Sequence, residues 1–163
     1  MTPVLAGLIA GAFGTLAMSG LAATARRVVE PTAVFGETHY ERVAVAVTAL
    51  ARRRAPAPAV ADPDTVLDLP ARRRMGEALH MLFGMITAVP LALVVDAAGR
   101  SATAVDGAVL AAILWVFGFL GYLPLLGVTA GPRSMTRFEV ARTMTSHLTF
   151  GVTTALVLAA LTA

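Results

Sequence analysis

The chain has 163 residues, of which 57% are hydrophobic and only 14% are charged. A water-soluble domain carries about 25% charged residues, so lipid is expected to surround most of this surface. Cys and Lys are absent and all 13 basic residues are Arg, which excludes disulfides, thiolate metal sites, a Schiff-base lysine and a nucleotide-binding P-loop. No basic stripe is interleaved with aromatic residues, so nucleic acid is not an expected partner.

The first apolar stretch, residues 4–25, contains no charged residue. At 1.5 Å per residue, 22 residues suffice to cross a hydrocarbon core about 30 Å thick. A signal peptide is the alternative, because Ala23-Thr24-Ala25 resembles a cleavage site. The residues before the stretch carry no positive side chain and the apolar run is long, so we predict a retained membrane span.

Residues 26–74 form a polar segment with nine Arg and six acidic residues. Inside it, Thr38 and Glu41 have the spacing of a helix capping box. Apolar residues then recur at helical spacing: Tyr40, Val43, Val47 and Leu50. We therefore predict an amphipathic helix at about 38–54 that lies on the membrane surface, followed by a stiff proline-rich linker.

Three further apolar stretches are long enough to cross a membrane. They run over about 75–95, 107–128 and 143–163. The sequence therefore predicts an all-α protein, in which residues 1–163 form a single membrane domain built as an integral membrane four-helix bundle with a short interfacial helix. Arg is concentrated in segment 26–74 and just before the last span, so both of these regions are expected on the cytoplasmic side. Both termini are then extracytoplasmic.

The second and fourth predicted spans share a nine-residue pattern. Residues 80–88 and residues 147–155 both read H-x-x-F-G-x-x-T-A, with five identities. Both helices leave the cytoplasmic face, so two helix pairs would form a parallel repeat related by an axis along the membrane normal. The alternative is chance, because Gly and Ala are common in any membrane helix.

Ionisable residues in the first turns of these two spans are the candidate site residues, because such groups are costly inside a membrane. They are Glu77, His80, Glu139, Arg142 and His147. One hypothesis gives them a structural role: they anchor the helix ends at the headgroups, and Glu139 pairs with Arg142 one turn away. The alternative hypothesis is a bound cofactor or a proton pathway.

The cofactor hypothesis rests on His80 and His147, which occupy equivalent positions of the repeat and could ligate a haem iron from two sides. Glu77-x-x-His80 also resembles one element of a carboxylate-bridged metal site. Met144 stands where the second Glu would be required, so no metal site is expected and haem remains the alternative to no cofactor. Both imidazoles should point into the bundle, with Phe83 and Phe150 packed beside them.

The opening residues 7–18, GLIAGAFGTLAM, resemble the start of small bacterial inner-membrane proteins of the YagU type. The region of His80 and Phe83-Gly84 is similar to their later spans. The resemblance implies a small multi-span protein of the bacterial inner (plasma) membrane without an assigned reaction. No nucleophile–base arrangement is visible, so we expect a structural or accessory protein and not an enzyme. Its expected partners are the lipid bilayer and either further copies of itself or a larger membrane complex. The alternatives are proton or small-solute transport, or pH sensing, through His80 and His147.

Overall fold

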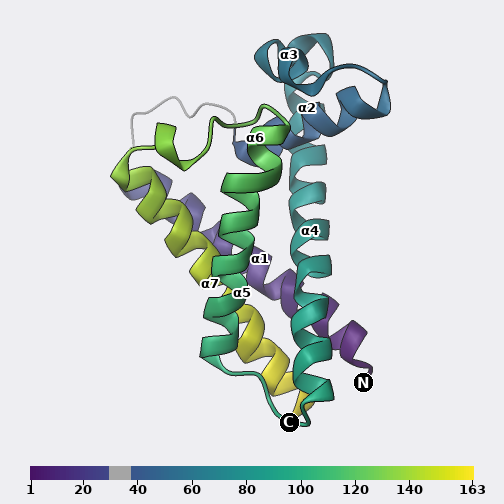
Figure 1. Cartoon of the computed structure of the whole chain (residues 1–163), viewed down its shortest axis with the longest axis vertical. Coiled ribbons are helices and arrows are strands. Elements are labelled where there is room, and N and C mark those ends of the chain that lie inside the picture. Colours follow the sequence, from purple (N-terminus) through teal and green to yellow (C-terminus); the bar gives the residue numbers. More distant parts are fainter. Residues whose placement is uncertain (30–37) are drawn as a thin grey trace. The chain divides into compact units, whose positions relative to one another are not determined.

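The computed structural model describes residues 1–29 and 38–163, and this part of the chain is all-α, as predicted (Figure 1). The helices are α1 (Pro3–Val29), α2 (His39–Ala51), α3 (Pro56–Ala61), α4 (Leu69–Ala97), α5 (Ala104–Val116), α6 (Leu123–Leu125) and α7 (Arg137–Thr162). A π-helical segment, Phe117–Tyr122, joins α5 to α6, and two short 3-10 turns cover Pro63–Thr65 and Pro132–Ser134.

Four of these helical stretches are long and apolar enough to cross a membrane, which confirms the predicted number of spans. They are Pro3–Thr24, Leu69–Ala97, Ala104–Leu125 and Arg137–Thr162. The second and fourth begin six residues before the predicted starts, because the charged residues there continue the helix; Arg and Glu are good helix formers. Helix α4 also runs through Pro90 without a break, as neighbouring helices allow in membrane proteins.

The described chain divides into two compact units. Of the described residues, the first unit comprises 1–29, 81–115 and 137–163, and the second comprises 38–80 and 116–136. Helix α4 therefore contributes its first turns to the second unit and its longer remainder to the first. The spans of the first unit form a four-helix bundle of α1, α4, α5 and α7.

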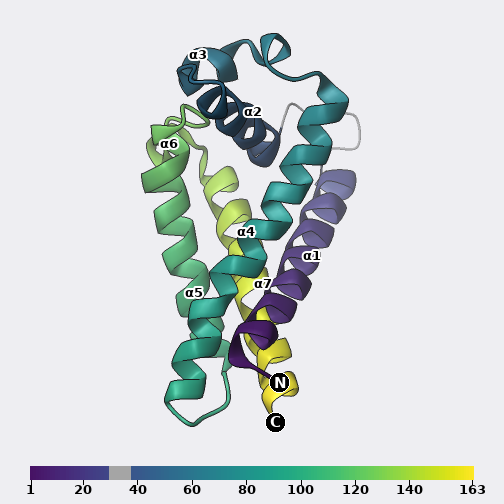
Figure 2. The same cartoon turned by 90° about the vertical axis from the view of Figure 1, so that its right-hand side faces the viewer.

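Glycines set the close approach of the helices in the first unit. A β-carbon on Gly11 of α1 would overlap the carbonyl oxygen of Gly84 and would lie 2.8 Å from the Met85 Cα on α4. Helix α1 also lies along α7 (Figure 2). Helices α5 and α7 cross where Gly107 and Gly151 each face the other's carbonyl oxygen. Small residues of this kind let backbones make the van der Waals contacts on which membrane helix association depends.

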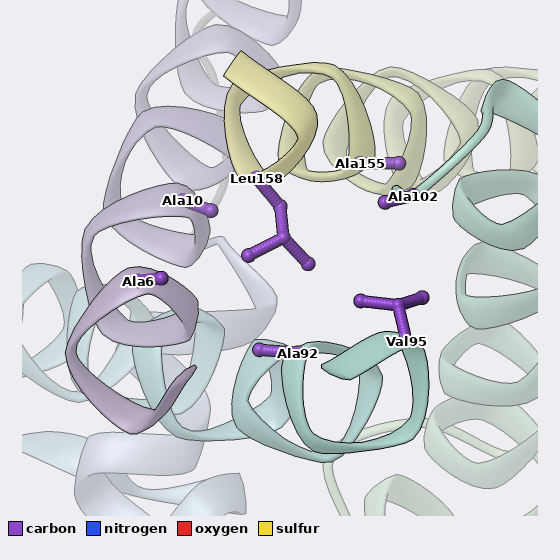
Figure 3. Packing of buried hydrophobic residues seen from close by; sticks show 7 residues of the cluster. All are labelled: Ala6, Ala10, Ala92, Val95, Ala102, Ala155 and Leu158. Atoms are coloured by element: carbon purple, nitrogen blue, oxygen red, sulfur yellow. The ribbon is translucent and has the colours of Figure 1, made fainter. Parts of the chain in front are cut away.

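One end of this unit is filled by a cluster of apolar side chains. Leu158 of α7 is fully buried and points between alanines of α1 and residues of α4 (Figure 3). The buried members of the cluster are Ala6, Ala10, Ala92, Val95, Ala102, Ala155 and Leu158. Because five of the seven are alanines, the helix backbones stay close and Leu158 occupies the space among them.

The end of the third span is a π-helix, which the sequence did not predict. Leu123 N–H donates to the carbonyl of Gly118, five residues earlier, instead of the usual four. Pro124 has no N–H to continue the ladder. Among the described residues, a β-carbon on Gly118 or Gly121 would lie near only an aromatic ring of the same segment, Tyr122 or Phe117. These two glycines therefore do not bring another helix close, unlike Gly107 and Gly151.

Candidate functional site

His80 lies at the junction of α2 and α4, inside the second unit. Its ring stacks on the ring of Tyr40, with centroids 5.2 Å apart and an interplanar angle of 20°. One turn earlier on α4, a β-carbon on Gly76 would lie only 2.9 Å from the Tyr40 carbonyl oxygen. The absence of a side chain at Gly76 therefore lets the start of α2 approach α4 closely enough for the two rings to stack.

The predicted capping box at the start of α2 is present and also ties the two helices together. Thr38 N–H donates to Glu41 Oε2 over 2.8 Å, and Glu41 N–H donates to Thr38 Oγ1 over 3.4 Å. The second carboxylate oxygen of Glu41 lies 3.6 Å from Nε of Arg73 on α4, although Glu41 is only 7% exposed. The helix cap and the ion pair together fix Tyr40 opposite His80.

The other candidate on α4, Glu77, is exposed. No hydrogen bond or ion pair joins its carboxylate to another described side chain. It lies three residues before His80, but the His80 ring is engaged by Tyr40. Within residues 1–29 and 38–163, no three His, Asp or Glu side chains gather closely enough to hold a metal ion.

His147 belongs to the first unit and has a different environment. Its Nδ1–H donates to the carbonyl of Thr143 on the same helix over 2.8 Å. The hydroxyl of Thr143 in turn accepts a hydrogen bond from the indole Nε1 of Trp115 on α5, over 3.0 Å. His147 is thus placed beside a polar contact that links α5 to α7. The proposal that His80 and His147 share one ligand stays a prediction.

Glu139 and Arg142 lie half-buried in the first turns of α7. The carbonyl of Arg142 accepts the Ser146 hydroxyl over 3.0 Å. The Arg142 guanidinium forms no ion pair with a carboxylate in the described part of the chain. The expected i, i+3 pair between Arg142 and Glu139 is therefore not formed. Arg142 is therefore free to extend toward the end of the helix, as interfacial Arg side chains do.

The turn between the second and third spans contains a bidentate ion pair that was not predicted from the sequence. Arg100 Nη1 and Nη2 donate to the two carboxylate oxygens of Asp106 over 2.8 and 2.7 Å. These bonds and the nearby negative charge raise the pKa of the Arg100 guanidinium above its usual value. Asp106 also accepts from Thr103 N–H over 2.8 Å and so caps α5. The spacing Thr103-x-x-Asp106 is the sequence signal that could have predicted this cap.

The two copies of the nine-residue pattern differ at their phenylalanines. Phe150 is 4% exposed, whereas Phe83 is 38% exposed. Phe150 lies between α1 and α4: its ring carbons would be 3.0 Å from a β-carbon on Gly14 and 3.2 Å from one on Gly84. The expectation that both phenylalanines pack beside the histidines inside the bundle is therefore wrong for Phe83.

Comparison of the chain with protein-family models, with characterised proteins and with solved structures finds no match.

Proposed function

We propose that this chain is a small multi-pass protein of the bacterial inner membrane with a structural or accessory role, as the YagU-type resemblance also suggests. The proposal rests on how closely the helices of the first unit pack against one another. Its helices meet through glycine backbones at Gly11–Gly84 and Gly107–Gly151, and Leu158 fills the space at one end. Close contacts of this kind suit a rigid membrane scaffold better than a solute pathway.

The arrangement in the membrane follows from the arginines. Nine Arg lie in segment 26–74. Arg133 precedes the last span, and Arg137 and Arg142 lie in its first turns, whereas Arg100 stands alone between the second and third spans. The positive-inside rule places the second unit's α2 and α3 on the cytoplasmic side and both termini outside. A reporter fused after Ala163 should therefore be active only in the extracytoplasmic compartment, and a cytoplasmic signal would overturn this orientation.

Reconstitution tests the scaffold role against transport. The full chain is inserted into vesicles that enclose a pH-sensitive dye, and a proton gradient is imposed. We expect the gradient to decay no faster than in vesicles that carry the double variant His80→Phe, His147→Phe. A decay that is faster in the wild type and lost in the double variant would favour proton transport and overturn the proposal.

A second candidate is a pH-dependent contact, and the Tyr40–His80 stack favours it. A charged imidazolium above a tyrosine ring gains a cation–π attraction that a neutral ring lacks. Glu77, three residues away on α4, and Glu41, next to Tyr40 on α2, are the nearby carboxylates along the two helices. Comparing the stability of the wild type with that of His80→Phe at about pH 5 and about pH 8 tests it. An identical pH response in the two proteins would exclude His80 as the sensor.

A further inference from the structure

The C-terminal end of α2 carries an arginine in a backbone conformation that favours glycine. Arg53 has φ of 57°, the left-handed region. Its neighbour Arg54 N–H donates back to the carbonyl of Ala49 over 2.8 Å, and Arg53 N–H donates to Leu50 over 2.9 Å. This is the hydrogen-bond pattern with which many helices end, and its left-handed position is usually glycine because glycine has no β-carbon to clash.

The same chain uses glycine at two other helix ends built in the same way. At the end of α4, Gly99 has φ of 61° and Arg100 N–H donates to the Val95 carbonyl over 3.2 Å. At the end of α6, Gly127 has φ of 71° and Val128 N–H donates to the Leu123 carbonyl over 2.9 Å. Of these three helix ends, only the end of α2 has a charged side chain at the residue with left-handed φ. Strain of this kind is commonly retained where the side chain has a role.

The arginine side chains at this end of α2 form no ion pair with a carboxylate among the described residues. Arg52 donates from Nη1 to the Val66 carbonyl over 3.0 Å. Arg53 and Arg54 are exposed, and neither guanidinium group forms a hydrogen bond or ion pair with a described residue. By contrast, Arg72 and Arg73 at the start of α4 are paired with Asp64 and Glu41. Two guanidinium groups thus remain available to an outside anion.

An uncovered apolar stripe runs along α2 toward the same end. The face with Ala44, Val45 and Ala49 is fully buried against the rest of the second unit. A different face carries Val47, which is 38% exposed, and Leu50, which is 49% exposed. Leu50 is three residues before Arg53, so the apolar stripe ends at the exposed arginines.

We infer that Arg53 and Arg54, with Val47 and Leu50, form a docking site for an anionic phospholipid of the membrane in which α4 is embedded. A guanidinium binds a phosphate through two parallel N–H groups, and interfacial helices combine such contacts with apolar residues that reach the acyl boundary. Helix α2 is held to the first turns of α4, a membrane span, through Glu41–Arg73 and Tyr40–His80, which places it at the interface. The inference rests on the proposed membrane role.

The experiment uses the full chain in detergent micelles and follows its melting temperature as lipid is added. Dioleoylphosphatidylglycerol should raise the melting temperature, and zwitterionic dioleoylphosphatidylcholine should raise it much less. In Arg53→Gln, Arg54→Gln the apparent affinity for phosphatidylglycerol should fall about 25-fold, because each interfacial Arg contributes about five-fold. The control Arg133→Gln, Arg137→Gln removes the same charge from exposed residues elsewhere and should lower the affinity much less. A loss as large as that of the Arg53, Arg54 double variant would show a general charge effect and would overturn the inference.

Arg53→Gly separates binding from folding. It removes one charge and relieves the left-handed strain, so without lipid it should melt at a higher temperature than the wild type, while its phosphatidylglycerol affinity falls about five-fold. The inference is overturned if the Arg53, Arg54 double variant binds phosphatidylglycerol as the wild type does, or if the two lipids act alike. Inorganic phosphate that reproduces the whole lipid effect would also overturn it and indicate a site for free phosphate. A chain recovered from cells without detergent would instead overturn the membrane role itself.

Discussion

Residues 80–88 and 147–155 have the same nine-residue pattern, and comparing them shows which part of a shared sequence sets a shared structure. Gly84 and Gly151 are both buried at helix crossings, and Ala88 and Ala155 are both 0% exposed. The two phenylalanines differ, since Phe150 is buried and Phe83 is exposed. The small residues therefore behave alike in both copies, and the large one does not.

The difference follows from what faces each helix. Phe150 is accommodated because Gly14 and Gly84 leave room for its ring. The histidines diverge in the same way: His80 stacks on Tyr40, and His147 donates to Thr143 of its own helix. A pattern of small residues fixes how closely backbones approach, whereas the role of a ring depends on the neighbouring helix, which the pattern does not encode.

The largest effect is expected from adding a methyl group at the shared glycines. Gly151→Ala would push a β-carbon into the backbone carbonyl of Gly107, which cannot move independently of α5. We expect a loss in the free energy of unfolding at or above the upper end of the 1–3 kcal/mol range typical of overpacking, roughly 3 kcal/mol or more. Titration with sodium dodecyl sulfate in mixed micelles measures this loss.

Gly84→Ala should cost less, about 1–2 kcal/mol, because the first atom in its way is the side-chain hydroxyl of Thr15. The matched test is the double variant Thr15→Ala, Gly84→Ala, in which that hydroxyl is absent. Most of the Gly84→Ala loss should then disappear. If the second substitution restores nothing, the helices in this part of the first unit do not meet through Thr15 and Gly84.

The phenylalanines test the part of the pattern that differs. Phe150→Ala removes roughly 100 Å³ from a buried position, and at about 24 cal/mol per Å³ the cavity alone costs about 2 kcal/mol, to which the lost contacts of the ring add. Phe83→Ala removes a ring that is 38% exposed, and its loss in the free energy of unfolding should be clearly smaller than that of Phe150→Ala. Equal losses in the same micelle titration would contradict the asymmetry between the two copies.

The ring stack at His80 is a smaller contribution. Aromatic pairs add about 0.5–1.5 kcal/mol beyond the area that they bury. A double-mutant cycle of Tyr40→Ala with His80→Ala should give a coupling in this range, and the cycle with His80→Phe should keep most of it, since a ring remains. A coupling near zero for His80→Ala would mean that the stack does not hold α2 against α4.

Much of the fold could be predicted from the sequence, and the reasons are physical. Apolar stretches of at least 20 residues have few alternatives to spanning helices, and the Thr38–Glu41 cap depends only on local spacing, so both predictions are confirmed. The partners of His80 and His147 could not be predicted, because they depend on which helices lie beside them. Arg53 was also missed, because a left-handed non-glycine residue leaves no sign in composition or periodicity. The π-helix before Pro124 was missed for the same reason, because it too leaves no sign in composition or periodicity.

The smallest effect concerns the threonines of the pattern, Thr87 and Thr154. The Thr87 hydroxyl donates to the Phe83 carbonyl over 2.8 Å. The hydroxyl of Thr154 is fully buried against Gly14 and has no hydrogen-bond partner among the described residues.

A buried polar atom without a partner costs roughly 1–3 kcal/mol, and an apolar group of the same shape avoids this cost. Thr154→Val should therefore be neutral or stabilise the protein by up to about 1 kcal/mol, with close contact at Gly14 offsetting part of the gain. Thr87→Val should destabilise it by about 0.5–1 kcal/mol, the net value of one hydrogen bond. The same titration with sodium dodecyl sulfate in mixed micelles measures the free energy of unfolding of both variants. A clear loss in the free energy of unfolding of Thr154→Val would show that the Thr154 hydroxyl has a partner in the membrane, either a bound water or a Gly14 Cα–H. The two threonines would then be equivalent.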